Sequence, residues 1–431
     1  MKEIFAISHS DSNESLPRFP QGELLAYYQP IIALETRSVV GYESLGRQVI
    51  DGTVRSLGPF FTDARIPVQE HVRVDRLLRE QSFAKLNGLA HPPTLFLNLK
   101  PSWIYEQFKQ TGELHTLHLL RKYDIPANRI CIEITEEEFK GSMSELNEIM
   151  NLYRECGCQI AIDDIGTGFS NFDRIAQIQP NLLKVDVHLM KKSASHKGYL
   201  GALRSFSTLA EQIGASLLIE GVESSQDLKR AIEIGARYVQ GYLFSPAERD
   251  FHPKDAFTSL IEAELREHRF RLRESMEHWD EVGRRMIATV FERDIRDEFD
   301  QFMNPFPGAR IDADLMSCEQ ADRVDRAIAR ILPRLDDSCL RVYLCDNNGI
   351  QLSSNHIRTE DGHWRVEEEY RNADWSWRPY FVPHLSHGES RIEAKLSLRY
   401  SDLDSHAWIR TASVPIGSSL LLLMDIEDNQ D

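Results

Sequence analysis

Between about residues 22 and 247, short apolar runs alternate with longer stretches in which apolar residues recur at helical spacing. That alternation is typical of α/β folds. Two of the apolar runs, 159–162 and 216–219, lack polar alternation, as expected for strands covered on both faces. We predict an eight-stranded barrel in preference to a mixed two-layer fold, with strands over 24–33, 38–46, 93–99, 129–135, 158–163, 181–186, 215–220 and 237–243.

The stretches between the predicted strands carry helix start and stop signals. Ser142 and Glu145 have the spacing of a capping box, and Gly157 stands where a helix should end. Between these signals lies an apolar stripe at helical spacing, made of Leu146, Ile149, Met150 and Tyr153. Helices are therefore expected to connect the strands, as parallel strands require.

The character of the chain changes after Pro253, where a charged helical pattern begins and extends to about Phe302. Pro305 and Pro307 end this pattern, because proline cannot continue a helix. One helical face is apolar, with Trp279, Val282, Met286 and Val290. We predict an N-terminal extension over 1–21, the barrel over 22–250, a helical linker over 251–304 and a smaller α+β domain over 305–431.

The α+β domain should contain one helix and several strands. The helix is expected near 317–333, and Asn348–Gly349 has the composition of a hairpin turn. The strand-like runs cover 340–345, 349–354, 391–399, 406–414 and 418–425.

Polar residues interrupt the predicted barrel strands at or near their carboxyl ends. In a parallel barrel those ends meet at one mouth, where active sites of this fold are built. We therefore expect the polar side chains to converge there. They are Glu43, Asn98, Glu133, Asp163, Asp164, Lys184, Glu220 and Gln240.

Such a group of carboxylates repels itself unless a cation compensates it. Mg²⁺ and Mn²⁺ prefer carboxylate and amide oxygens, and the adjacent Asp163 and Asp164 offer a carboxylate that could bridge two ions. Two neighbouring ions are a common device for splitting phosphodiesters, because they activate a water and stabilise the attacking and leaving oxygens. The residues favour a two-metal phosphoesterase over other metal-assisted chemistry and do not identify its substrate.

Composition narrows the classes of partner. The 431 residues suggest two or three domains, and the formal net charge of −17 repels nucleic acid and anionic lipid. No apolar run approaches the roughly 20 residues that span a bilayer, and the start lacks the pattern of a signal peptide. Six cysteines are few for a chain of this length, and we interpret them as reduced thiols. We expect a cytoplasmic protein that binds neither nucleic acid nor membranes.

Eight short motifs occur in order along the barrel region: Tyr28–Ile31, Glu43–Arg47, Asn98–Leu99, Glu133–Glu136, Asp163–Gly168, Leu183–Asp186, Glu220–Glu223 and Gln240–Tyr242. Together they resemble the EAL-domain family of cyclic-di-GMP phosphodiesterases. The resemblance implies a modified eight-stranded TIM-type barrel that hydrolyses cyclic di-GMP to linear 5'-pGpG. It also implies two Mg²⁺ or Mn²⁺ ions as cofactors, and a homodimer.

The resemblance further assigns roles to single residues. Lys184 matches the lysine near the catalytic water, and Glu220, or in second place Glu223, is the candidate general base. One ion would be held by Glu43, Asn98, Glu133 and Asp163, and the second by Asp163, Asp164 and Glu220.

Other positions match supporting or nucleotide-binding residues of the family. Glu136 corresponds to the anchor of the loop after Asp164, to which Gly166, Thr167 and Gly168 belong, and Asp186 is expected to orient Lys184. Arg47 matches a phosphate-binding arginine, a role that suits its planar fork of donors. The other expected contacts to cyclic di-GMP are Gln29, Leu45, Asp75, Gln240 and Pro246, where simple packing is an equally good interpretation.

Two functions fit this resemblance. One is a phosphodiesterase, and the other is a receptor that binds cyclic di-GMP without useful hydrolysis and signals through partner contacts. Ser44 and Ile165 depart from the family's usual Ala and Phe, but no metal ligand is missing. We therefore favour the enzyme.

The motifs Ser56–Phe61, Trp375–Phe381 and Tyr400–Leu403 resemble the YkuI-like branch of the family, in which a PAS-like or Cache-like domain follows the barrel. The Trp375–Phe381 segment gathers aromatic residues around one arginine, as a small-molecule site or a packed core corner would. Candidate contacts for an unknown regulatory ligand are Asp346, Arg378, Tyr380, Asp402 and Arg410.

Overall fold

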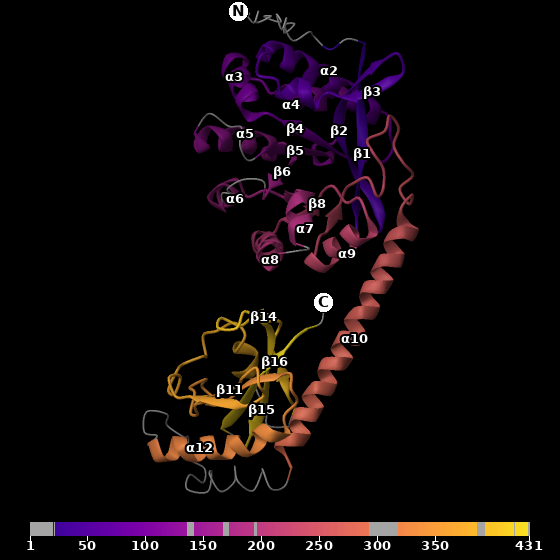
Figure 1. The fold of residues 1–431 in the computed structure, drawn as a ribbon. Helices are drawn as coiled ribbons and strands as arrows, with labels where there is room; N and C mark the ends of the chain where they lie inside the picture. Colours follow the sequence, from indigo (N-terminus) through magenta and orange to yellow (C-terminus); the bar gives the residue numbers. More distant parts are fainter. Residues whose placement is uncertain are drawn as a thin grey trace, which may run out of the picture. The chain divides into compact units, whose positions relative to one another are not determined.

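The computed structural model divides into two compact units, Met1–Arg269 and Phe270–Asp431, which are described separately (Figure 1). The structure describes residues 20, 22–135, 142–166, 172–193, 196–292, 318–385, 393–417 and 419–429.

Eight strands of the first unit close into a ring. Neighbours in the ring follow the order β1-β9-β8-β7-β6-β5-β4-β2, and β1 pairs with β2 to close it. The predicted eight-stranded barrel is therefore confirmed. Its strands are β1 (Glu23–Ala33), β2 (Ser38–Ile50), β4 (Thr94–Leu99), β5 (Ile130–Thr135), β6 (Gln159–Ile165), β7 (Leu182–Val185), β8 (Ser216–Ile219) and β9 (Tyr238–Val239).

The barrel departs from an all-parallel ring at one strand. β1 runs antiparallel to both β2 and β9, whereas the other neighbours in the ring are parallel. A tight turn between Ala33 and Ser38 makes β1 and β2 a hairpin, so no crossover helix separates them. A further strand, β3 (Thr53–Ser56), extends β2 outside the ring and was not predicted.

Helices connect the parallel strands, as the apolar spacing predicted (Figure 1). Ser142 and Glu145 form a capping box at the start of α5, whose predicted apolar stripe is buried. The helices are α1 (Gly58–Thr62), α2 (Val68–Leu86), α3 (Pro101–Thr111), α4 (His115–Tyr123), α5 (Met143–Glu155), α6 (Phe172–Ile178), α7 (Val187–Ser193), α8 (Lys197–Ile213) and α9 (Ser225–Ile234).

Strand β9 corresponds to the last predicted barrel strand, 237–243, and is much shorter than predicted, because the chain turns away from β1 after Val239. Gln240 N–H donates to the Ile219 carbonyl, and its own carbonyl accepts from Val222 N–H, both at 3.0 Å. The chain therefore packs against the loop that follows β8.

Gly241 lies in this contact, and its missing side chain is required there. A Cβ on Gly241 would lie 2.1 Å from the carbonyl oxygen of Val222 and 2.3 Å from its nitrogen. Backbone atoms cannot move aside by changing rotamer, so we expect Gly241→Ala to lower the free energy of unfolding by about 1–3 kcal/mol. Gly201→Ala in α8 is the control, since open space surrounds Gly201 and alanine favours a helix. Equal melting temperatures for the two variants would contradict this expectation.

The second unit is built on a seven-stranded antiparallel sheet in the order β12-β11-β10-β16-β15-β13, with β14 paired to β15. Of the predicted strand over 349–354 only isolated bridges at Ile350 and Gln351 form, and of the described part of the predicted strand over 391–399, residues 393–399, only Lys395–Leu396 is a strand. The strands are β10 (Cys339–Asp346), β11 (Asn355–Arg358), β12 (Trp364–Glu367), β13 (Lys395–Leu396), β14 (Tyr400–Ser401), β15 (Trp408–Ile416) and β16 (Leu420–Glu427).

One face of this sheet is covered by helices. Helix α10 (Thr258–Val290) connects the two units along the chain, and α12 (Cys318–Ile331) belongs to the second. The apolar face of α10 that the sequence predicted packs into the core of the second unit, together with Val324 and Ile328 of α12. Among the described residues, neither α10 nor any other helix combines the length and apolar character of a membrane span.

Candidate active site

Inside the barrel, a layer of polar side chains follows a layer of apolar side chains in the direction of the C-terminal ends of the strands. The apolar layer contains Phe96, Cys131, Ala161, Leu182 and Leu218, together with Ile31. Side chains two residues apart on a strand point to the same face. Two residues further along these five strands stand Asn98, Glu133, Asp163, Lys184 and Glu220. The strand pleat therefore brings the predicted polar residues together at the C-terminal ends of the strands.

Lys184 lies at the centre of this group. Its ammonium nitrogen is 2.6 Å from Glu133 Oε1, 2.5 Å from Glu220 Oε1 and 3.3 Å from Asp163 Oδ1. Glu43 Oε2 lies at 3.8 Å. Because the Lys184 side chain is only 1% exposed, one buried cation faces four carboxylates.

One ammonium cannot balance four carboxylates. Burial by itself would lower the pKa of Lys184, but Asp163, Glu133 and the other carboxylates outweigh it and raise that pKa well above its usual value. Burial also raises the pKa of Glu133 and of Glu220 well above the ordinary range, and neighbouring carboxylates add to the shift. Proton uptake by these glutamates, or the binding of a further cation, would relieve the repulsion among the carboxylates.

A bulge at the end of β6 brings two adjacent aspartates to the cluster. The register between β6 and β7 shifts between Ile162 and Ile165, and Asp164 takes the left-handed conformation with φ 58°. Asp164 N–H donates to Asp163 Oδ1 at 2.9 Å. One carboxylate oxygen each from Asp163, Asp164 and Glu220 lie within 4.8 Å of one another. Burial, with Asp163 beside it, raises the pKa of Asp164 to about 6.

Glu43 lies in the middle of β2 and is held by two amides. Asn98 Nδ2 donates to its Oε1 and Gln240 Nε2 to its Oε2, both at 2.7 Å. Gln240 Nε2 also lies 3.2 Å from Gln29 Oε1, and Gln29 Nε2 donates to the Ser245 carbonyl at 3.3 Å. The structure thus links Gln29, Glu43, Asn98 and Gln240 in one chain of hydrogen bonds.

The cluster has the chemistry of a divalent metal site. Its donors are carboxylate and amide oxygens, which Mg²⁺, Mn²⁺ and Ca²⁺ prefer. Glu133 Oε2 is buried and has no hydrogen-bond partner among the described residues, although a buried carboxylate oxygen is costly to leave unpaired. These residues therefore fit bound divalent ions.

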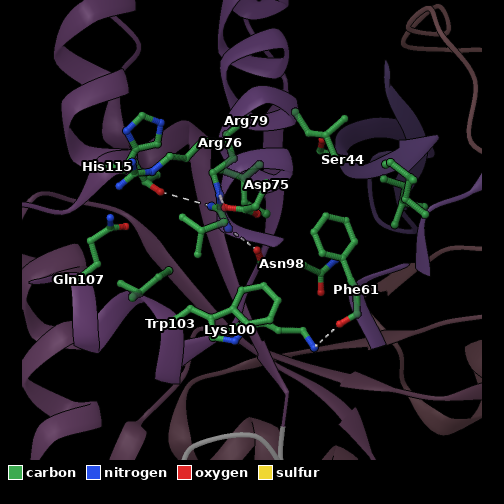
Figure 2. A pocket seen from close by; sticks show the side chains of 18 of the residues that line it. Ser44, Phe61, Asp75, Arg76, Arg79, Asn98, Lys100, Trp103, Gln107 and His115 are labelled. Atoms are coloured by element: carbon green, nitrogen blue, oxygen red, sulfur yellow. Dashed lines mark hydrogen bonds and ion pairs between the residues drawn. The ribbon is translucent and has the colours of Figure 1, made fainter. Parts of the chain in front are cut away.

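A cavity of about 280 Å³ adjoins the cluster at Asn98 (Figure 2). Of the expected nucleotide contacts, Leu45, Arg47 and Asp75 line it. Figure 2 shows Arg76, Arg79 and His115 on one side of the cavity and Phe61 on the other.

Some predicted residues lie apart from the cluster. Glu223 pairs with Lys191 at 2.7 Å on the surface, and Asp186 Oδ1 accepts from His188 N–H at the start of α7 rather than meeting Lys184. Pro246 is exposed beside Ser245. Gly166 adopts a left-handed conformation with φ 96° against Leu189. Glu136, Thr167 and Gly168 lie outside the described residues.

Arg79 is a site residue that the sequence analysis missed. It is buried, and its guanidinium donates to Asp75 Oδ2 at 2.7 Å, to Thr116 Oγ1 at 3.3 Å and to the Asn98 carbonyl. It therefore joins an expected nucleotide contact to an expected metal ligand. The available signal was a charged residue within the buried stripe of α2, next to Leu78 and before Phe83.

Comparison with known proteins agrees with this geometry. A family model described as the EAL domain matches residues 13–247, and one described as an EAL-domain associated signalling protein domain matches residues 273–429. The chain is 34% identical to the EAL-domain containing protein YkuI of Bacillus subtilis over 410 residues, which cover 94% of each chain. It is 32% identical to the cyclic di-GMP phosphodiesterase RocR of Pseudomonas aeruginosa over 231 residues, covering 52% of this chain and 57% of RocR.

The fold is similar to the crystal structure of Bacillus subtilis YkuI in complex with cyclic di-GMP and calcium, with a TM-score of 0.78 and 31% sequence identity. The match covers 94% of this chain and 97% of that chain. The match over both units confirms the resemblance to the YkuI-like branch. The chain therefore belongs to the EAL-domain family.

Proposed function

We propose that this protein hydrolyses cyclic di-GMP to linear 5'-pGpG with the help of two Mg²⁺ or Mn²⁺ ions. The observation that carries the proposal is the cluster of four carboxylates around the buried Lys184, which adjoins a cavity lined by Arg47. The phosphodiesterase RocR and the cyclic-di-GMP complex of YkuI support the choice of nucleotide.

We infer two ligand sets. Glu43, Asn98, Glu133 and Asp163 would hold one ion. Asp163, Asp164 and Glu220, whose carboxylate oxygens lie within 4.8 Å of one another, would hold the second. When bound, such ions lower the pKa of an attacking water and stabilise charge on phosphate oxygens.

The chain's own residues supply orientation and proton transfer. Lys184 offers a fixed ammonium that can orient the water and offset negative charge on the phosphate. Glu220 can take the water's proton at Oε2, because its Oε1 already faces Lys184. Within the described residues, the Arg47 side chain makes one hydrogen bond, from Nη1 to the Gly46 carbonyl, and its other guanidinium donors can bind a phosphate oxygen.

The test is incubation of the full chain with cyclic di-GMP and Mn²⁺ or Mg²⁺, followed by chromatography. We expect 5'-pGpG to accumulate, and EDTA to stop its formation. Tight binding of cyclic di-GMP with no product would show a receptor instead. Faster cleavage of a simple bis-phosphodiester would point to another substrate.

Binding of cyclic di-GMP should depend on a divalent cation. Without one, the nucleotide's two phosphates meet an excess of carboxylates, so we expect Ca²⁺ to raise its affinity at least about tenfold over EDTA in a calorimetric titration. Asp164→Asn should weaken this response, whereas Asp173→Asn, at an exposed position of α6, should not. Equal affinity in Ca²⁺ and EDTA would contradict the metal assignment.

We also propose that the protein is a homodimer and that its C-terminal unit regulates the barrel. The signalling-domain match over residues 273–429 supports the regulatory role. Light scattering would test the dimer, and pGpG formation before and after a ligand binds the C-terminal unit would test the regulation.

A further inference from the structure

The C-terminal unit contains a cavity of about 110 Å³ that is lined by residues of this unit. Three of its lining residues come from the aromatic segment Trp375–Phe381: Trp375, Arg378 and Tyr380. Tyr343 and Asp402 also line it. Three of the five positions expected to contact a regulatory ligand therefore share one cavity: Arg378, Tyr380 and Asp402.

The two remaining positions serve the fold. Asp346 Oδ1 accepts from the backbone N–H groups of Asn348 and Ile350 in the turn after β10. Arg410 pairs with Asp428 at 2.8 Å. Neither of them lines the cavity.

The cavity walls are preformed. Gln351 is fully buried, and its side chain accepts from Trp375 Nε1 at 2.8 Å and donates to Asn355 Oδ1 at 3.0 Å. The rings of Tyr380 and Tyr400 stack with their centroids 4.6 Å apart, and Tyr400 Oη lies 2.6 Å from Thr411 Oγ1. These contacts fix the aromatic walls without a ligand, so little ordering would be needed for binding.

The two arginines of the cavity differ in their partners. Arg341 pairs with three carboxylates: Asp402, Asp404 and Asp425 each approach its terminal guanidinium nitrogens to 3.0 Å, and only its buried Nε atom has no hydrogen-bond partner among the described residues. Arg378 has no ion pair or side-chain hydrogen bond with any described residue, and its Nε atom is buried. Its guanidinium carbon lies 5.2 Å from the Trp377 ring centre and 5.6 Å from that of Tyr380.

We propose that this cavity binds a small organic carboxylate through the guanidinium of Arg378. A buried donor without a partner is costly, and the planar fork of arginine matches a carboxylate with two parallel hydrogen bonds. Three carboxylates lie close by around Arg341 and would repel a dianion, so a phosphate is disfavoured. The volume equals that of about four water molecules, which limits the ligand to a few non-hydrogen atoms.

Calorimetry and thermal shift on the full chain would test the proposal with four probes at millimolar concentration: acetate, L-alanine, methylammonium and inorganic phosphate. Acetate presents a carboxylate alone, and L-alanine adds an ammonium group that Asp402 or Asp404 could accept. We expect at least one of these two probes to bind and methylammonium and phosphate not to bind. Binding of neither carboxylate probe, or equal binding of methylammonium or phosphate, would overturn the proposal.

Variants of Arg378 distinguish binding in this cavity from a general effect of anions on the protein. Arg378→Gln should weaken binding about tenfold or more, because a charge-assisted hydrogen bond is lost. Arg326→Gln, at an exposed position of α12, makes the same charge change and should leave binding unaltered. Arg378→Lys keeps the cation and should bind with intermediate affinity, which keeps the test decisive if the glutamine variant fails to fold. Equal affinity of all three variants would overturn the assignment to Arg378.

Discussion

Replacing Lys184 with methionine should lower the free energy of unfolding of the metal-free protein by about 3–5 kcal/mol. Methionine keeps the length of the side chain but removes the charge that now lies within 4 Å of four carboxylates. Those carboxylates would then have to take up protons or repel one another inside the barrel. Urea unfolding in EDTA measures the effect.

A surface lysine provides the matched control. Lys191 also pairs with a glutamate, Glu223 at 2.7 Å, but its side chain is 44% exposed. Exposed ion pairs contribute little, so Lys191→Met should change the free energy of unfolding much less than Lys184→Met does. Divalent cations should recover part of the stability lost in Lys184→Met, since they neutralise the same carboxylates. A loss no larger than that of the control would contradict the central role of Lys184.

The net charge of −17 is partly explained by this cluster. Glu43, Glu133, Asp163, Asp164 and Glu220 all belong to the acidic excess. Together with divalent ions they would attract the phosphates that the protein as a whole repels. With the proposed ions bound, the charge at the mouth of the barrel would be opposite in sign to the net charge of the protein.

The apolar pattern was sufficient to predict the ring of strands, because each inner strand is covered on both faces. It failed where burial is incomplete. All four residues of β3 are exposed, so their side chains carry no apolar signal. Strand β12 has no buried residue either, and it was missed for the same reason. β9 was overestimated because the turn at Gln240 depends on contacts with the distant Val222.

The site was predictable where strand periodicity places it. Asn98, Glu133, Asp163 and Lys184 each stand two residues beyond a residue of the apolar layer, and the two-residue repeat of the strands turns them to the same side. Residues supplied by helices and loops were harder to place. Arg79 reaches the site from α2, and Glu223 turns outward although it follows Glu220 by only three residues.

We expect the largest difference in activity between variants of Glu220, which lies in the carboxylate cluster, and of Glu223, which points away from it. Glu220→Gln should slow the formation of 5'-pGpG about 100-fold or more. The Glu220 side chain is only 20% exposed and contacts Lys184. Together with Asp163 and Asp164 it forms a group of carboxylates that could hold a metal ion. The amide can neither accept the water's proton nor supply a charged ligand. Initial rates at saturating Mn²⁺ and cyclic di-GMP give the measurement.

Glu223→Gln makes the same chemical change three residues away and should slow the reaction less than about tenfold. Its side chain is 51% exposed and paired with Lys191, so its loss removes a surface ion pair and leaves the cluster intact. The comparison therefore decides which of the two glutamates the reaction requires. If Glu223→Gln proved the slower enzyme, the loop after β8 would have to rearrange when cyclic di-GMP binds, bringing Glu223 inward in place of Glu220.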